Sequence, residues 1–298
     1  MSSGITANIA FALGCHVDAE SLSLDFIEVE QRRRCWAGLM MLHTIQSTSF
    51  GNPDLLSLSK YDVKLPSDVN DLDITASAVS ECSSQPSEMT YVLFKFRLYN
   101  LTTKICEQVF GQSKPSRSII ASLDHEIGKE SRKVHAKFYC DGETGQLQNH
   151  HIVQRQILEM YTHQLYLLLH RPFFDPGRNE EQESSRSREK CVTSAKVLVE
   201  SYRDFFQNPQ FKDFKWFGIG IGSFLAFHGA VALSASIMDG KEDSSVSLTE
   251  VTSLLDETME LFQQLTERSP ICAQGLPVLQ YLRSVPSSIN QTYQSSEA

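Results

Sequence analysis

Apolar residues recur along most of this chain at intervals of three and four positions, the spacing that places them on one face of an α-helix. The clearest stripe lies within residues 91–109 and consists of Tyr91, Phe94, Leu98, Leu101, Ile105 and Val109. Runs of alternating β-branched residues between tight turns, which would predict strands, do not occur in the sequence. The pattern therefore predicts an all-α protein built from many helices.

Further helices are predicted over residues 26–48, 119–127, 147–170, 191–205 and 247–265. The apolar side of the first of them consists of Phe26, Val29, Trp36, Leu39, Met40 and His43. On the same helix, Glu28 and Glu30 each stand four residues before an arginine. This order favours ion pairs on the helix surface.

Local signals mark where two of these helices end or begin. The Arg171-Pro172 pair ends the helix over 147–170, because proline cannot continue a helix and restricts the residue before it. Ser247 followed by Glu250 is a capping-box pattern, which predicts that a helix begins there.

Irregular or polar connections are predicted over residues 51–90, 175–189 and 239–246, the second of them a charged, disordered loop. None of these connections separates a second apolar core. We therefore predict one domain over residues 1–285, followed by a disordered polar tail over 286–298.

The composition is that of an ordinary globular protein, with 298 residues of which 41% are hydrophobic and 21% charged. Acidic residues outnumber basic ones by 36 to 27, which gives a net charge of −9. Because DNA-binding surfaces neutralise phosphates, this balance argues against direct nucleic-acid binding by the chain. The first residues, MSSGITANIAFALGCH, lack the basic start of a signal peptide.

Residues able to hold a metal are scattered along the sequence. The seven cysteines include no CxxC pair, so we expect neither a zinc site nor a disulfide framework, but mostly buried, reduced thiols. No HxxxH spacing occurs among His150, His151, His163 and His170. Nucleophile-elbow and P-loop motifs are also lacking. We therefore predict no catalytic residue, no cofactor-binding residue and no metal ligand.

Two further patterns invite a ligand or a membrane. The GIGIG run at 218–222 lacks the third glycine of a dinucleotide fingerprint, since position 223 is serine, so close helix packing on small residues is favoured. The uncharged stretch 216–238 is long enough to cross a membrane. Its many small residues and central histidine favour a buried core helix instead, and we predict no membrane interaction.

The Arg32-Arg33-Arg34 triplet could form a phosphate-binding patch or a nuclear signal. On a helix, however, three successive residues spread over roughly 300° of the circumference at 3.6 residues per turn. Surface ion pairs and buried structural contacts are therefore favoured for the three guanidinium groups.

The stretch from Leu13 to Asp73 reads LGCH, then FIEVEQRRRCWAGLMMLHTIQST, then FGNPDLLSLSKYDVKLPSDVND. This order of pieces resembles the middle homology region, the regulatory domain, of fungal zinc-cluster transcription factors. In that family an LGLH piece is followed by an acidic residue and RRR-x-W on a helix, then by a GRP turn and a D-x-x-LP segment. The matching positions here are Gly14, His16, Glu30, Arg32, Arg33, Arg34, Trp36, Gly51, Pro53, Asp62, Leu65 and Pro66.

Two later pieces extend the resemblance. LLLHRPFF at 167–174 is similar to the family's LHRPF helix end, with His170, Arg171 and Pro172 at the matching positions. WFGIGIGSFLAFHGAVAL at 216–233 is similar to the family's late apolar helix.

The sequence also departs from the family. Ala37 stands where a second tryptophan is frequent, His43 where an aspartate is frequent, and Asn52 where the turn usually has arginine. The six clustered cysteines that hold two zinc ions in the family's DNA-binding unit are lacking, as are the helices that precede LGLH. Two hypotheses follow: a truncated gene model, or a naturally shortened regulator that works through a partner.

The resemblance implies an all-α regulatory domain of a nuclear protein, not an enzyme, that controls transcription of metabolic or secondary-metabolite genes. It implies two kinds of partner, namely a second regulator in a homodimer or in a heterodimer that supplies DNA binding, and a small-molecule effector. It implies no cofactor. The alternative function is that of a helical enzyme or a small-molecule-binding accessory protein of a biosynthetic pathway.

Overall fold

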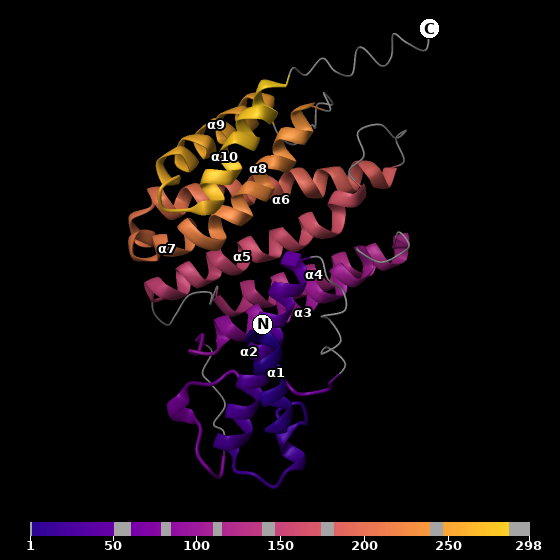
Figure 1. Ribbon diagram of the computed structural model, residues 1–298, viewed down its shortest axis with the longest axis vertical. Helices are drawn as coiled ribbons and strands as arrows, with labels where there is room; N and C mark the ends of the chain where they lie inside the picture. Colours follow the sequence, from indigo (N-terminus) through magenta and orange to yellow (C-terminus); the bar gives the residue numbers. More distant parts are fainter. Residues whose placement is uncertain are drawn as a thin grey trace. The chain divides into compact units, whose positions relative to one another are not determined.

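The computed structural model describes residues 2–50, 61–78, 85–109, 115–138, 147–173, 182–238 and 247–285 (Figure 1). These residues form α-helices joined by short helical turns, and no β-strand occurs among them. The all-α prediction is therefore confirmed. The predicted tail over 286–298 lies outside the described residues.

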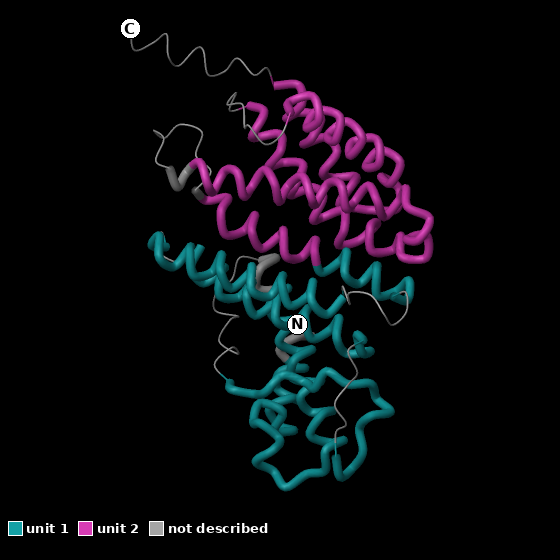
Figure 2. The backbone as a smooth tube through the Cα atoms, turned by 180° about the vertical axis from the view of Figure 1, so that it is seen from behind, with its two compact units in different colours: residues 1–158 teal, residues 159–298 magenta. Residues whose placement is uncertain are grey.

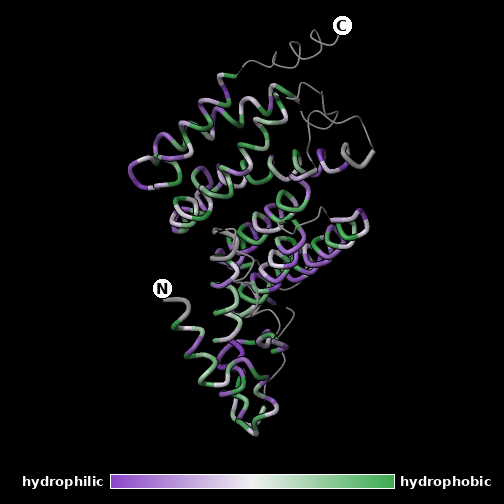
Figure 3. The backbone as a smooth tube through the Cα atoms, turned by 45° about the vertical axis from the view of Figure 1, so that its right-hand side comes forward, coloured by the Kyte–Doolittle hydropathy of each residue, from purple (hydrophilic) through white to green (hydrophobic). Residues whose placement is uncertain are grey.

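The chain divides into two compact units, residues 1–158 and 159–298, and the boundary falls within helix α5 (Asn149–His170) (Figure 2). Each unit is described by itself below. The single domain over 1–285 stays a prediction. In both units, hydrophobic and hydrophilic residues alternate in short stretches along the helices, as amphipathic helices require (Figure 3).

Unit 1 contains α1 (Ser2–Ala12), α2 (Phe26–Phe50), α3 (Thr90–Val109) and α4 (Arg117–Phe138). Two short 3-10 turns, η1 (Ala19–Ser21) and η3 (Asp71–Asp73), interrupt the connections. α2 packs on α1 and α3, and α3 packs on α4. The predicted stripe of α3 supplies much of this core, because Phe94, Leu98, Leu101 and Ile105 are buried.

Unit 2 contains η4 (Arg171–Phe173), α6 (Gln182–Gln207), η5 (Pro209–Phe214), α7 (Lys215–Phe217), η6 (Gly218–Gly222), α8 (Ser223–Met238), α9 (Leu248–Leu265) and α10 (Pro270–Ser284). α8 is the central helix of the unit, since it packs on α6, α9 and α10. It approaches α6 closely at Gly229, where an added Cβ would lie 2.9 Å from the Ala195 carbonyl oxygen.

The predicted apolar helix over 216–238 is interrupted. α7 leads into a π-helical turn in which Gly220 has non-helical φ/ψ values of −92° and −111°, and α8 begins only at Ser223. The Ser223 hydroxyl donates to the Gly218 carbonyl at 2.6 Å and so ties the first residue of α8 to the start of the π-helical turn. By length and composition, the described helical stretch Pro209–Met238 could span a membrane. Within it, α8 buries Leu225 and Leu233, as predicted for a core helix.

Small residues at the kink allow close packing, as predicted for the GIGIG run. An added Cβ would lie 2.8 Å from the Phe206 ring at Gly218, and 2.9 Å from the Phe217 carbonyl oxygen at Gly222. Gly220 has open space beside it, so it does not take part in this close packing.

One local prediction is wrong. Residues 182–189 of the predicted loop belong to α6, because Ser187 and Arg188 turn inward and are buried despite the charged composition. Residues 175–181 lie outside the described part. The helix predicted to begin at Ser247 is confirmed, since Ser247 stands at the N-cap of α9, although its side chain makes no cap bond. Phe26, the first residue of α2, is 46% exposed.

We predict that Gly229→Ala destabilises the protein by about 1–3 kcal/mol, because the new methyl group meets a backbone carbonyl that cannot move without shifting α6. Urea unfolding measures the effect. The matched control is Gly38→Ala in α2, where nothing lies within 4 Å of an added Cβ. That variant should gain roughly 0.5–1 kcal/mol from helix propensity. Equal effects of the two substitutions would contradict the close approach of α6 and α8.

We also predict that acid weakens the fold through two histidines of unit 2. Burial lowers the pKa of His163 and of His228 to about 4 in each case, whereas the unfolded imidazole titrates near 6.5. Between about pH 4 and pH 6.5, the two histidines bind protons in the unfolded state but not in the folded state. The free energy of unfolding should therefore fall as the pH is lowered from 6.5 toward 4, by up to about 1.4 kcal/mol per pH unit for each histidine.

Urea unfolding at pH 7, 6 and 5 measures this slope. His228→Gln should flatten it, because glutamine keeps a hydrogen-bonding group beside Gln164 but binds no proton. An unchanged slope in that variant would show that His228 does not contribute.

Candidate functional site

The first motif glycine turns the chain after α1. Gly14 has φ +70°, its N–H donates to the Phe11 carbonyl at 3.0 Å, and the Cys15 N–H donates to the Ala10 carbonyl at 2.9 Å. This is a Schellman ending, which favours glycine because a Cβ is strained in the left-handed conformation. The turn brings the next motif residue, His16, back toward α2.

His16 enters an aromatic cluster of four rings. Its ring centroid lies 5.0 Å from Phe11, 5.3 Å from Tyr61 and 6.4 Å from Trp36. The Trp36 and Tyr61 rings meet edge to face at 5.7 Å, a favoured aromatic geometry. The indole is only 4% exposed, so it is the buried centre of this aromatic cluster.

The three motif arginines point in different directions, as predicted for ion pairs and structural contacts. Arg32 binds Glu28 at 3.0 Å and donates to the Leu13 carbonyl at 2.6 Å, near the carboxyl end of α1. Arg34 binds Glu30 at 3.1 Å. Both predicted i,i+4 pairs are therefore confirmed.

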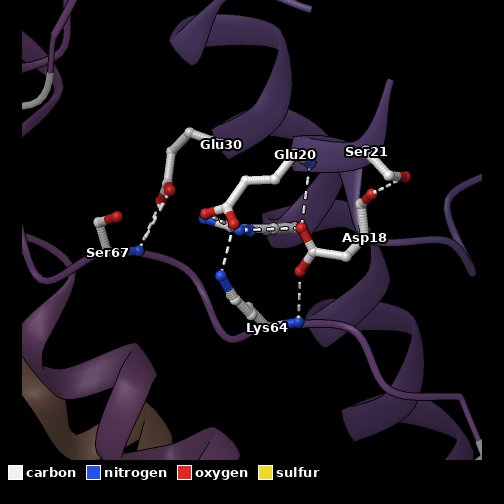
Figure 4. A network of polar contacts seen from close by, with 7 residues as sticks. Asp18, Glu20, Ser21, Glu30, Lys64 and Ser67 are labelled. Carbon is white, nitrogen blue, oxygen red and sulfur yellow. Dashed lines mark hydrogen bonds and ion pairs between the residues drawn. The ribbon is translucent and has the colours of Figure 1, made fainter. Parts of the chain in front are cut away.

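Arg33 is the buried member of the triplet, with 9% of its side chain exposed. Its Nη2 lies 2.9 Å from Asp18 Oδ1 and 2.7 Å from Glu20 Oε1 (Figure 4). The other Asp18 oxygen accepts the Lys64 backbone N–H at 2.9 Å, and the Lys64 ammonium binds Glu20. We call these four residues the Arg33 clamp. They fasten the segment that begins at Tyr61 to η1 and α2.

Charge and hydrogen bonds set the ionisation of the Arg33 clamp. Burial opposes the charged form of Asp18, but N–H donors from Lys64 and Glu20, together with Arg33, lower its pKa below the ordinary value. Hydrogen bonds from Lys64 and then Arg33 lower the pKa of Glu20. The clamp is therefore ionised at neutral pH, with two carboxylates facing two cations.

A second set of contacts, the Glu30 clamp, holds the same segment further on. Glu30 is 3% exposed, and its two carboxylate oxygens accept the Ser67 N–H at 3.0 and 3.1 Å (Figure 4). Arg34, already bound to Glu30, donates to Asp71 Oδ1 at 2.6 Å. The segment from 64 to 71 is thus fixed to α2 at two places.

Asp68 joins the same segment to α3 and α4. One of its oxygens accepts hydrogen bonds from the hydroxyls of Ser87 and Thr90, each at 2.6 Å, just where α3 begins. The other oxygen lies 3.5 Å from Lys137 Nζ. Burial acts against its charge, yet these donors lower the pKa of Asp68. The segment therefore links α2, α3 and α4.

A cavity of about 390 Å³ lies in unit 1 where α2, residues 61–65 and α3 meet. We call it the unit-1 cavity. Its lining consists of Trp36, Ala37, Met40, Met41, His43, Thr44, Tyr61, Val63, Lys64, Leu65, Phe96, Tyr99, Asn100, Thr103, Lys104 and Glu107. Trp36, Tyr61 and Lys64 belong both to this lining and to the aromatic cluster or the Arg33 clamp.

Few groups in the cavity wall carry charge. Burial lowers the pKa of His43, which is therefore neutral near pH 7. Lys104 binds Glu126 at 2.8 Å, and Lys64 binds Glu20 within the Arg33 clamp. The hydroxyls of Thr44 and Thr103 lie 3.0 Å apart and are buried.

The structure brings most motif positions of Leu13 to Asp73 together, though not all. Leu65 lines the cavity and Pro66 is buried, whereas Asp62 is exposed. Gly51 and Pro53, with Asn52, lie outside the described residues. His170, Arg171 and Pro172 belong to unit 2, where His170 is buried 3.1 Å from the Ser187 hydroxyl and the other two are exposed in η4.

Sequence reasoning missed Asp18, Glu20, Lys64 and Asp68. Their spacing from the arginines has no periodicity, so no local pattern pairs them. One usable signal existed at Asp18, because an aspartate two residues before a glutamate can cap a short helical turn, and its side chain does accept the Glu20 N–H at 3.1 Å.

Among the residues that the structure describes, no group of three or more His, Cys, Asp or Glu could hold a metal ion. Five cysteines fall in this part and all are free thiols; Cys35 is exposed and the other four are buried. We therefore take the unit-1 cavity as the candidate site, and its shape and hydrogen-bonding groups as the features that could select a ligand.

Comparison with known proteins defines the class. Residues 1–152 match the fungal specific transcription factor domain, and the chain belongs to this family. It is 30% identical over 67% of its length to the pyrrolocin cluster transcription factor of a fungal species, covering 27% of that protein. It is 27% identical over 64% of its length to an uncharacterized transcriptional regulatory protein of Schizosaccharomyces pombe, covering 25% of it.

A third relative is a Zn(2)-C6 fungal-type transcription factor of Monascus ruber, 24% identical over 66% of this chain and covered over 25% of its own length. The chain thus spans about a quarter of the length of the curated relatives it matches. No solved structure matches it. The regions around the Arg33 clamp and the Glu30 clamp lie within the part that defines the family.

We predict that Arg33→Met destabilises the protein by about 2–3 kcal/mol, because it leaves two carboxylates without their buried partner. The matched control is Arg32→Met on the same helix. Its side chain is 25% exposed, and its loss should cost about 1 kcal/mol or less. Denaturant unfolding of both variants measures the difference. Equal losses would mean that burial does not set the strength of these pairs.

Proposed function

We propose that this chain is the regulatory part of a nuclear transcription regulator that controls a metabolic or secondary-metabolite gene set. The observation that carries the proposal is the family match over residues 1–152. The printed names of relatives support it, since one is the transcription factor of a pyrrolocin cluster and another is of the Zn(2)-C6 type. These names describe transcription factors and not enzymes.

DNA contact in this proposal comes from outside the 298 residues. The chain has a net charge of −9 and no paired CxxC cysteines, so it offers neither phosphate-neutralising charge nor a zinc cluster. The three motif arginines are engaged in ion pairs with carboxylates and are not available as a phosphate patch. A zinc-cluster segment of the same protein, or a DNA-binding partner regulator, supplies the contact.

The test is transcript profiling after deletion of the gene. We expect a coordinated change across a set of neighbouring biosynthetic genes. Loss of one metabolite with unchanged transcripts would overturn the proposal in favour of an enzyme or an accessory protein. In the parent strain, a tagged protein should be nuclear and should co-purify with a six-cysteine zinc-cluster regulator, unless its own full-length transcript encodes that segment.

A further inference from the structure

We propose that the unit-1 cavity binds a neutral, largely apolar small molecule, held between α2, α3 and residues 61–65. Its action as an effector of transcription rests on the proposed function, whereas binding itself does not. Three features of the cavity favour such a ligand: its size, the chemistry of its wall and the connection of that wall to the two clamps.

Size and shape come first. A volume of about 390 Å³ falls within the range of roughly 300–1,000 Å³ that small-molecule sites occupy. The inner wall is built from side chains such as Trp36 and Phe96, which are 4% and 6% exposed, and from Met40 and Met41. Thioether side chains adapt their shape to different apolar ligands. The wall therefore suits an aromatic or aliphatic body.

The charges of the wall favour a neutral ligand. Lys64 and Lys104 lie at the exposed rim, and each already binds a glutamate outside the cavity, Glu20 and Glu126 respectively. An anionic ligand would have to compete with these carboxylates for each ammonium. The remaining charged group of the lining, Glu107, would repel an anion. His43, made neutral by burial, adds no charge.

Hydrogen bonding gives the ligand an orientation. The Thr103 hydroxyl donates to the Tyr99 carbonyl at 3.2 Å, so its single proton is used. The Thr44 hydroxyl lies 3.0 Å from the Thr103 oxygen and can donate to it. This chain of hydroxyls lies on one side of the cavity, and the amide of Asn100 lies in the same lining. A ligand with one polar group at an end of an apolar body fits this distribution, since a hydroxyl can donate to a threonine oxygen and a carbonyl can accept from the Asn100 amide.

The wall also connects the ligand to the fold. Tyr61, Val63, Lys64 and Leu65 line the cavity, and Lys64 is a member of the Arg33 clamp. A molecule packed against these residues stabilises the conformation in which the segment is fastened to α2. A ligand that binds only that conformation shifts the population toward it in proportion to its differential affinity.

The experiment uses the purified full chain and Nile red, a neutral solvatochromic dye, with fluorescence titration. We expect saturable binding with blue-shifted emission. Met41→Trp places an indole in the cavity and should weaken binding about tenfold or more, because it fills the volume. The matched control is Leu42→Trp, the next residue on α2, which is 55% exposed and does not line the cavity. It should bind the dye like the unsubstituted chain.

Each outcome decides something. Equal dye binding by Met41→Trp and the unsubstituted chain would overturn the site, because the dye would then bind elsewhere. If Met41→Trp loses its thermal unfolding transition, Ala37→Leu, which also fills the cavity, replaces it. Tighter, Met41-sensitive binding of the anionic dye anilinonaphthalene sulfonate would overturn the neutral class. A cavity-filling allele that loses dye binding but leaves transcripts unchanged would refute the effector role alone.

Discussion

A guanidinium group that is nine-tenths buried must be matched by charge where it lies, and Arg33 imposes this constraint on unit 1. Its Nη2 atom meets two carboxylates, Asp18 and Glu20, and these in turn bind the backbone and the side chain of Lys64. The short turn after α1 and the segment that follows Tyr61 are therefore placed by one cation on α2. Removing that cation would leave two carboxylates facing each other across a partly buried space.

The unit-1 cavity follows from the same arrangement. Because the segment is fastened at Lys64 and again at Ser67, residues 61–65 lie opposite α2 and α3 without filling the space between them. Trp36 forms the wall on the α2 side and is supported from behind by Phe11 and His16. The motif residues thus act as a frame that gives the cavity its shape, which explains why arginines and an aromatic ring occur together on one helix.

The periodicity of the sequence predicted contacts between residues three or four positions apart. The α3 stripe and the Glu28–Arg32 pair depend on neighbours three and four residues apart, so the sequence shows them. Asp18 and Glu20, the partners of Arg33, lie 15 and 13 positions before it, and Lys64 follows only after α2 has ended, so only the folded chain brings them together. The sequence predicts a loop at the start of α6 because charged residues dominate there, and the burial of Ser187 shows only in the structure. The cavity is a property of packing and has no sequence pattern.

Within the Arg33 clamp, the Lys64–Glu20 pair joins side chains that are 63% and 52% exposed and contributes little, whereas Arg33 and Glu30 are buried. The cavity lies at residues 61–65, beside the Lys64 end of the Arg33 clamp. Contacts made there add to those of Lys64, while residues 67–71 stay held by Glu30. A small molecule can thus change the order of one end of the segment without unfolding the other.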